Sequence, residues 1–268
     1  MQDLALLAEL RGSVLQPGNF TETNVIAHCL STLASDESRE RYLDEIVAGQ
    51  VRATWGGPQV ASSGVAFSVR EVENRLRLSG IVNVATDAHR CDVMVVDAGA
   101  GDDAFLFLIP LDAQGVEVRP LGGLDLTKRF SRVKLQDVLI EQEQIVARGA
   151  EAESALNMMV ALAAVLTAAD SIGAMAADLE MTVQYALDRT AFGRPIGSFQ
   201  AVKHLLADTS LALECSKSIV FEAARGLGDN ATDSLQLAGL AKAFVDDAGV
   251  TLAQIGRASC RERVYGLV

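Results

Sequence analysis

Apolar residues follow a helical spacing at both ends of the chain and alternate with polar residues in the middle. Residues 1–50 and 141–256 carry apolar positions three and four apart, which is typical of helices. Residues 51–140 carry short runs of period two, separated by Gly- and Asp-rich links, which is typical of strands. The pattern predicts an α+β protein with N-terminal helices, a middle β domain and a C-terminal helical bundle.

The C-terminal region divides into three predicted helices, at roughly 151–190, 197–227 and 232–255. The first break falls at Gly193-Arg194-Pro195, where glycine and proline stop a helix. Such a break leaves backbone groups free at a helix junction beside Arg189, an arrangement suited to binding phosphate.

The segment 257–268 interrupts this pattern. It turns basic and aperiodic after an acidic chain rich in Ala and Leu. The abrupt change predicts a tail that is not native to the protein, with a genuine variable tail as the alternative.

Composition excludes several classes of function. The net charge of −12 argues against a nucleic-acid partner, because phosphate repels an acidic surface. The longest apolar run, Ala155–Ala169, is shorter than the ~20 residues that span a bilayer, and the start lacks a signal-peptide pattern. We therefore expect a cytoplasmic protein without a membrane partner. Four cysteines show no metal-ligand spacing and are predicted to be free thiols: Cys29, Cys91, Cys215 and Cys260.

The stretch Tyr185–Gln200 resembles the signature of the acyl-CoA dehydrogenases. In that family a helix ending Tyr-x-x-x-Arg-x-x-Phe-Gly-x-Pro-Ile leads into a helix that starts Phe-Gln, and the arginine and glutamine reach the FAD of a neighbouring subunit. The family also has a barrel-like β domain between two helical domains. Carried over residue by residue, the resemblance implies FAD contacts at Arg189, Thr190, Phe192 and Gln200.

The middle domain keeps only part of the family's flavin motifs. Thr54 matches the threonine of a Thr-Glu-Pro segment, but Trp55 replaces the glutamate, and Gln59-Val60 replaces a following Gly-Ser. Thr86 matches the threonine of a Trp-Ile-Thr segment, whose tryptophan is Val84 here. The resemblance implies flavin contacts at Thr54 and Thr86. The alternative for Thr86 is a strand residue whose hydroxyl bonds its own sheet.

No catalytic base is identifiable. Acyl-CoA dehydrogenation needs a carboxylate near the α-carbon of the thioester and a flavin that accepts the β-hydride. The family's helix position for the glutamate matches Ala163, and Asp170 lies two turns further on the same face, where a structural role is the stronger interpretation. The charged run at 128–132 is predicted to be a solvated surface. The three histidines lack ligand spacing: His28, His89 and His204.

The resemblance favours one subunit of a heteromeric dehydrogenase of the actinobacterial steroid or bulky-acyl type. In this hypothesis a paralogous acyl-CoA dehydrogenase subunit supplies the base, an acyl-CoA thioester is the substrate, and an electron-transfer flavoprotein-type protein is the acceptor. The chain is also expected to be truncated at both ends relative to the family. Two alternatives stay open: a truncated homomeric acyl-CoA dehydrogenase, and a helical scaffold or adaptor without flavin.

Overall fold

The computed structural model describes residues 1–33, 42–56, 67–73, 75–229 and 231–261. The chain folds as two compact units. The barrel unit comprises Pro17–Ala163, and the helical unit combines Met1–Gln16 with the chain from Ala164 onward. The first 16 residues thus group with the C-terminal helices rather than with residues 17–50. The predicted domain limits at 50, 140 and 256 stay a prediction.

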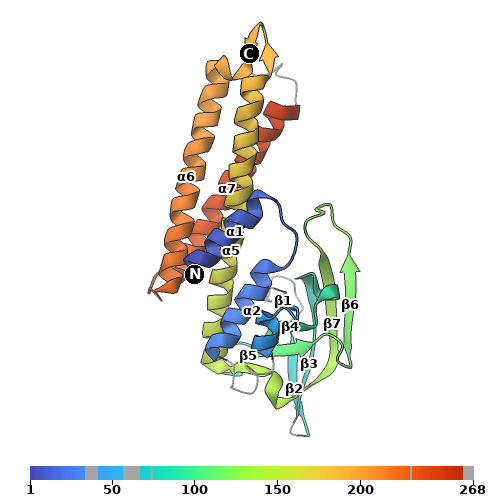
Figure 1. Cartoon of the computed structure of the whole chain (residues 1–268). Helices are drawn as coiled ribbons and strands as arrows, with labels where there is room; N and C mark the ends of the chain where they lie inside the picture. Colours follow the sequence, from blue (N-terminus) through green and yellow to red (C-terminus); the bar gives the residue numbers. More distant parts are fainter. Residues whose placement is uncertain (34–41, 57–66, 74, 230, 262–268) are drawn as a thin grey trace. The chain divides into compact units, whose positions relative to one another are not determined.

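The barrel unit contains two four-stranded sheets (Figure 1). One has the order β1-β4-β5-β8, in which only β1 and β4 are parallel, and the other is antiparallel with the order β2-β3-β7-β6. The strands are β1 (Ala53–Trp55), β2 (Ser68–Val72), β3 (Arg75–Thr86), β4 (Val93–Ala98), β5 (Phe105–Pro110), β6 (Val116–Leu121), β7 (Phe130–Ile140) and β8 (Ile145–Arg148). Helices α2 (Phe20–Leu33) and α4 (Asp44–Val47) precede them, and α2 packs against β1.

The core of the barrel unit is formed by apolar side chains of both sheets. On β7 buried and exposed residues alternate from Ser131 to Gln136, as the period of two predicts. The fully or almost fully buried members come from β3, β4, β5 and β7: Leu78, Val82, Met94, Val96, Phe107, Ile109, Val133 and Leu135. Burying each such side chain stabilises the fold by about 1.5–3 kcal/mol.

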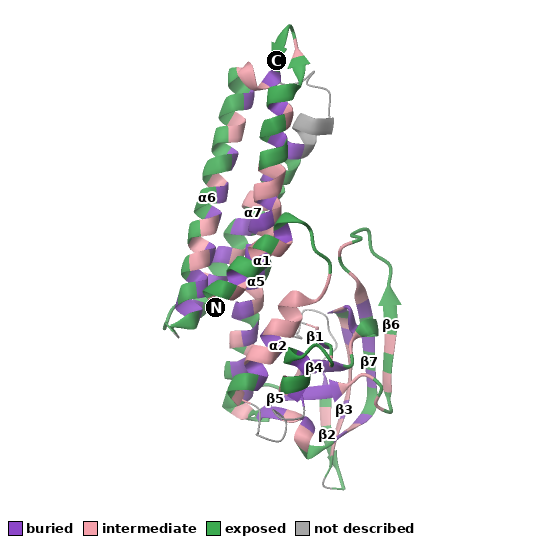
Figure 2. Ribbon diagram, in the orientation of Figure 1, coloured by how far each residue is buried: buried purple, intermediate pink, exposed green. Residues whose placement is uncertain are grey.

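The helical unit contains α1 (Gln2–Ser13), α6 (Gln200–Gly228), α7 (Ser234–Arg261) and the part of α5 (Gly149–Asp188) that follows Ala163. These bounds confirm the three predicted C-terminal helices. Figure 2 shows buried positions along the inner faces of these helices and exposed positions along their outer faces. This pattern is the amphipathic arrangement that the helical period indicates.

Helices α1 and α5 cross with their backbones in close approach. A Cβ atom on Gly12 would lie 1.8 Å from the Asp170 carbonyl oxygen, and one on Gly173 would lie 1.8 Å from the Glu9 carbonyl oxygen. No side chain fits at either position. The two glycines therefore set this crossing.

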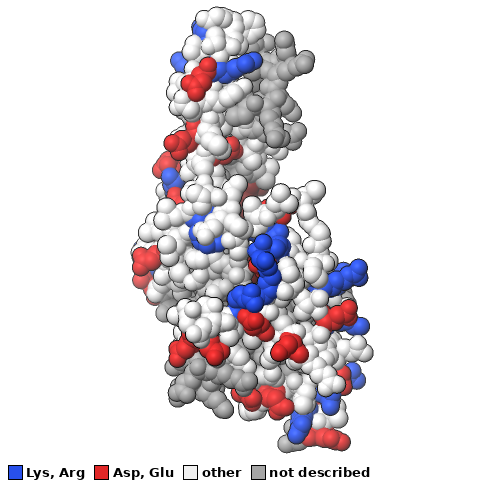
Figure 3. All heavy atoms as spheres, turned by 45° about the vertical axis from the view of Figure 1, so that its right-hand side comes forward, with Lys and Arg blue, Asp and Glu red and all other residues white. Residues whose placement is uncertain are grey.

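Helix α5 is long and apolar enough to cross a membrane, judged by length and composition. However, 56% of its most apolar window is buried inside the protein, as in the core helix of a bundle. Acidic and basic side chains are interspersed over the face drawn in Figure 3. The expected absence of membrane and nucleic-acid partners stays a prediction.

Candidate functional site

The helix junction, residues 189–200, connects α5 to α6. It contains a short β-hairpin with a two-residue turn. Strands β9 (Thr190–Ala191) and β10 (Arg194–Pro195) pair antiparallel across Phe192 and Gly193. These two residues have φ angles of 53° and 77°, as a type I′ hairpin turn requires. Glycine adopts this conformation freely, whereas phenylalanine does so only under constraint. The predicted helix break is therefore a tight and ordered turn.

A small apolar cluster anchors the junction. Ile196, 1% exposed, packs with Ala186 of α5 and Val202 of α6. The Ile196 N–H donates to the Arg189 carbonyl at 2.8 Å, which closes the base of the hairpin. Both helix ends are thus held together by side-chain burial and by a backbone hydrogen bond.

The polar side chains of the junction are exposed. Arg189, Thr190 and Gln200 are all solvent-accessible, and none of them makes a side-chain hydrogen bond or ion pair within the described part of the chain. The first turn of α6 has no side-chain cap, and the buried Ser198 hydroxyl is also without a partner there. The junction therefore contains an unpaired guanidinium and an uncapped helix N-terminus, and both kinds of donor suit an anion such as a diphosphate.

Aromatic contacts distinguish the second arginine of the junction from the first. The Arg194 guanidinium lies over the Phe199 ring at 4.2 Å from its centroid. Phe192, 78% exposed, meets the same ring edge-on, with centroids 6.2 Å apart. Arg194 is therefore held by stacking, while Arg189 remains available to a ligand or a partner.

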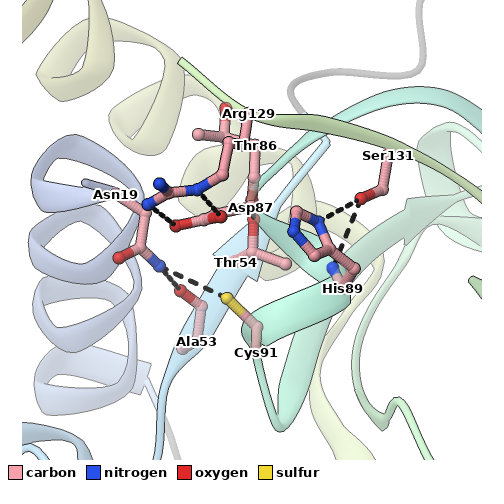
Figure 4. Close-up of polar contacts among 9 residues, drawn as sticks. All are labelled: Asn19, Ala53, Thr54, Thr86, Asp87, His89, Cys91, Arg129 and Ser131. Carbon is pink, nitrogen blue, oxygen red and sulfur yellow. Dashed lines mark hydrogen bonds and ion pairs between the residues drawn. The ribbon is translucent and has the colours of Figure 1, made fainter. Parts of the chain in front are cut away.

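The barrel turn, residues 86–91, is the second candidate region and follows the end of β3 (Figure 4). Thr54 on β1 is completely buried, and its hydroxyl donates to the Thr86 carbonyl at 2.5 Å. The Thr86 side chain is half-buried, and its own hydroxyl has no hydrogen-bond partner among the described residues. Thr54 thus fixes the Thr86 backbone through this hydrogen bond, and of the two hydroxyl groups only that of Thr86 is unpaired among the described residues.

Asp87 and Arg129 close the barrel turn with an ion pair. The Arg129 guanidinium donates to both Asp87 carboxylate oxygens, at 2.8 and 3.2 Å, and the Asp87 N–H donates to the Arg129 carbonyl at 2.7 Å. These hydrogen bonds, followed by the charge of the guanidinium, hold the pKa of Asp87 below its ordinary value against the effect of burial. Arg129, part of the run 128–132 predicted to be a solvated surface, keeps a side chain that is 39% exposed and also pairs with Asp87.

Two further contacts fix the same turn, as Figure 4 shows. The buried Ser131 hydroxyl lies 3.0 Å from His89 Nδ1 and accepts from the His89 N–H at 3.3 Å. The Asn19 amide donates to the Ala53 carbonyl at 2.8 Å and to Cys91 Sγ at 3.4 Å. Burial, followed by the Asp87 charge, raises the pKa of Cys91 to about 12, so this thiol stays protonated.

The replaced flavin motifs have visible structural consequences. Trp55 is 5% exposed, and its indole N–H has no partner within the described residues. Val84, in the place of the family's tryptophan, is 51% exposed. Gln59 and Val60 lie outside the described residues. The barrel unit therefore keeps the two threonines and lacks the aromatic side chain that the family places beside them.

The structure adds no catalytic base to the sequence analysis. Ala163 carries no ionisable group, and the Asp170 backbone lies against Gly12 at the α1–α5 crossing. Among the described residues, no group of three His, Cys, Asp or Glu side chains is placed to hold a metal ion. A proton acceptor for this type of reaction is not evident on the described chain.

Sequence reasoning missed the pairing of Asp87 with Arg129. The two residues are 42 positions apart, and neither belongs to a motif. The available signal was weak: an aspartate directly after Thr86, and an arginine directly before the strand that pairs with β3. Only the antiparallel register, in which Thr86 faces Phe130, brings them together.

The order of N-terminal helices, two-sheet unit and helical bundle defines an acyl-CoA dehydrogenase fold, and solved structures confirm it. The structure titled PigA with FAD and proline superposes with a TM-score of 0.87 at 22% identity, over 96% of this chain and 71% of that chain. The ChsE4-ChsE5 complex from Mycobacterium tuberculosis superposes with a TM-score of 0.85 at 22% identity, over 96% of this chain and 69% of that chain.

Sequence comparison finds relatives of the C-terminal part of the chain. Residues 152–258 match the family described as acyl-CoA dehydrogenase, C-terminal domain. The acyl-CoA dehydrogenase IpdE2 of Mycobacterium tuberculosis is 36% identical over 105 residues, which are 39% of this chain and 29% of that relative. Residues 152–258 are thus similar to the C-terminal domain of the acyl-CoA dehydrogenases, and the resemblance predicted from Tyr185–Gln200 is confirmed.

Proposed function

We propose that this protein is one subunit of an FAD-dependent acyl-CoA dehydrogenase that desaturates an acyl-CoA thioester between its α- and β-carbons. The observation that carries the proposal is the helix junction, which combines an exposed Arg189 with the uncapped start of α6 inside the region that matches the family's C-terminal domain. FAD, when bound, supplies the acceptor for the β-hydride. The helix junction of this chain is proposed to complete the FAD site of the partner subunit.

The polar residues of the junction have separate roles in this proposal. Arg189 binds the diphosphate of FAD as a charged donor, and the first N–H groups of α6 add to the same positive field. Gln200 and Thr190 bind polar atoms of the cofactor next to it. Phe192 supplies an exposed aromatic face for the cofactor's rings.

In the barrel unit, the Thr86 hydroxyl is the group proposed to bind the flavin ring. Thr54 holds the Thr86 carbonyl and acts through that residue rather than on the flavin. The unpaired Trp55 N–H is a further buried donor in the same strand as Thr54. A buried donor without a partner among the described residues is consistent with a ligand that completes it.

A paralogous acyl-CoA dehydrogenase subunit is proposed to supply the base that removes the α-proton. Two observations support such a partner. No base is evident on the described residues, and the helical unit exposes large apolar side chains on its outer faces. On α7 these include Leu240 at 61% and Phe244 at 43% exposure, one helical turn apart. The complex is proposed to be cytoplasmic and to pass electrons to an electron-transfer flavoprotein-type acceptor.

The test is the flavin content of the complex that the full-length protein forms with a paralogous subunit from the same genome. Arg189→Ala is expected to lose FAD while the assembled complex elutes unchanged. Arg225→Ala is the matched control, because Arg225 is an exposed arginine of the same unit that pairs with Glu222 on its own helix. Equal flavin content in Arg189→Ala and wild type would remove the site assignment.

The same preparation separates the two alternatives. A wild-type protein that assembles without a partner and retains FAD would support the homomeric dehydrogenase. A wild-type complex without any flavin would support the scaffold or adaptor. In the proposed function, flavin is retained only after the paralogous subunit joins.

A further inference from the structure

Two Arg–Asp pairs connect β3 with β7. The proximal clamp is Asp87–Arg129, at the end of β3 that carries Thr86, and the distal clamp is Arg77–Asp137. Each pair has a short contact of 2.8 Å between a guanidinium nitrogen and a carboxylate oxygen. Each aspartate has a left-handed backbone, with φ angles of 55° for Asp87 and 54° for Asp137.

Each clamp lies within a few residues of a register shift between the two strands. The β3–β7 ladder is irregular between Leu78 and Gly80, next to the distal clamp, and again between Val82 and Ala85, shortly before the proximal clamp. Left-handed backbone is disfavoured for residues other than glycine and persists only where the surroundings enforce it. An Arg–Asp pair accompanies the left-handed aspartate in both places.

The two clamps differ in what they hold. The Asp87 side chain is 11% exposed and that of Asp137 is 57% exposed. The residue before Asp87 is Thr86, whose carbonyl is already fixed by the Thr54 hydroxyl. Thr86 is thus held by Thr54 on one side and by the Asp87 backbone and side-chain bonds on the other. Asp137 has no such neighbour, because its backbone N–H bonds the Ser79 hydroxyl on the exposed part of the sheet.

We propose that Asp87 and Arg129 are positioning residues for the flavin contact of Thr86, and that their paired charges keep the field at that contact neutral. This inference rests on the proposed function, because Thr86 needs a flavin to contact. A residue that binds a ligand gains most when a second set of contacts fixes its rotamer and backbone. The proximal clamp provides such contacts from positions 42 residues apart.

The charges give the proposal a signature that a purely structural role would not produce. Asp87→Asn leaves the Arg129 guanidinium without its counter-charge, and a positive charge near the flavin favours its reduced form. Arg129→Gln leaves the Asp87 carboxylate unpaired and has the opposite effect. The reduction potential of the bound flavin is therefore expected to rise in Asp87→Asn, to fall in Arg129→Gln and to return close to wild type in the double variant.

The experiment uses the FAD-loaded complex of the full-length protein. Asp87→Asn is expected to weaken FAD binding by roughly tenfold, the effect of losing one charge-assisted hydrogen bond. Asp137→Asn is the matched control, since it removes the same kind of ion pair at the distal clamp, and it is expected to change affinity less than about twofold. Arg129→Lys keeps the charge and loses the bidentate geometry, so it is expected to weaken binding without lowering the potential.

The outcomes separate the two proposals. A wild-type complex that binds no FAD overturns the proposed function and the clamp together. A wild-type complex that binds FAD, with unchanged affinity and potential in Asp87→Asn, overturns the clamp alone. Potentials that shift in the same direction in Asp87→Asn and Arg129→Gln also overturn it, because they indicate general loosening. If Asp87→Asn does not fold, Arg129→Gln and Arg129→Lys provide the test instead, because one removes the positive charge and the other keeps it. Their FAD affinities and flavin reduction potentials are then compared with wild type.

Discussion

The barrel turn and the helix junction are both irregular connections with a non-glycine residue in left-handed conformation, but they use their polar groups in opposite ways. In the barrel turn, Asp87 is paired with Arg129, and the Thr54 hydroxyl donates a hydrogen bond to the Thr86 carbonyl. In the helix junction, apolar packing and backbone bonds hold the turn, and the Arg189 side chain is left unused. In the barrel turn only the Thr86 hydroxyl lacks a partner among these groups, whereas the polar side chains of the helix junction are unpaired within the described residues.

In the proposed function, this contrast separates residues that position a ligand contact from residues that bind the ligand. A buried polar group must find its partners inside the fold, because an unsatisfied one costs free energy. An exposed arginine carries no such requirement, since water solvates it. Substitutions in the barrel turn should therefore lower stability, and substitutions in the helix junction should lower ligand retention. The following expectations test this division, from the largest effect to the smallest.

The largest expected effect is the difference in alkylation rate between a thiol in the barrel turn and an exposed thiol on α6. The pKa of Cys91, raised to about 12 mainly by burial, leaves a thiolate fraction at pH 8 roughly a thousandfold below that of an unperturbed thiol. Cys215 on α6 is exposed. In native protein, alkylation followed by peptide mass spectrometry should modify Cys215 first and Cys91 only after unfolding. Similar rates in denaturant provide the control, and similar rates in native protein would show that the barrel turn is open.

Thr54→Val should destabilise the barrel unit by about 1–3 kcal/mol, because it leaves the partly buried Thr86 carbonyl without the donor from Thr54. Trp55 is the only tryptophan and lies next to the substitution, so its fluorescence reports the urea transition. Thr190→Val, at an exposed position of the helix junction, is the matched control and should change stability by less than about 0.5 kcal/mol. An equal loss in both variants would contradict the division.

The pH dependence of stability should contain a contribution from Asp87. Its pKa in the folded protein is lowered from the ordinary 3.8, first through hydrogen bonds from Arg129. The resulting stabilisation is complete above the unfolded pKa and is lost as the pH falls through the folded pKa. The stability difference between wild type and Asp87→Asn should therefore be widest above pH 3.8 and should shrink below it. Urea midpoints measured across this range check it, and a constant difference would argue against the ion pair.

The smallest expected effect is the difference in unfolding free energy between alanine substitutions of the two arginines of the helix junction. Arg194→Ala removes the stacking on Phe199 and should cost about 0.5–1 kcal/mol. Arg189→Ala should leave the unfolding free energy within about 0.5 kcal/mol of wild type. Thermal unfolding followed by circular dichroism in the assembled complex measures both. FAD retention should show the opposite order, with the larger loss in Arg189→Ala. A stability loss in Arg189→Ala larger than in Arg194→Ala would contradict the assignment of Arg189 as a ligand-binding residue.

The sequence by itself determined the elements, because each depends on local pattern. The period of two on β7, the helical period of α6 and α7 and the break at Gly193 all follow from near neighbours, and the structure places them within a few residues of the prediction. The motif from Tyr185 to Gln200 also indicated the family, since its spacing is contained in one stretch of chain. What the structure added there is the hairpin geometry of Phe192 and Gly193.

Only the tertiary structure decided which polar groups are used. Thr54 and Thr86 are equivalent in the sequence as motif threonines, yet one is buried as a support and the other keeps its hydroxyl free. In the sequence Arg129 is one member of a charged run, and only the β3–β7 register places it against Asp87. Hydrogen bonds between residues 30 or more positions apart depend on strand register and burial. Neither quantity is encoded in a local pattern, so the division between positioning and binding emerges only when the sheets are assembled.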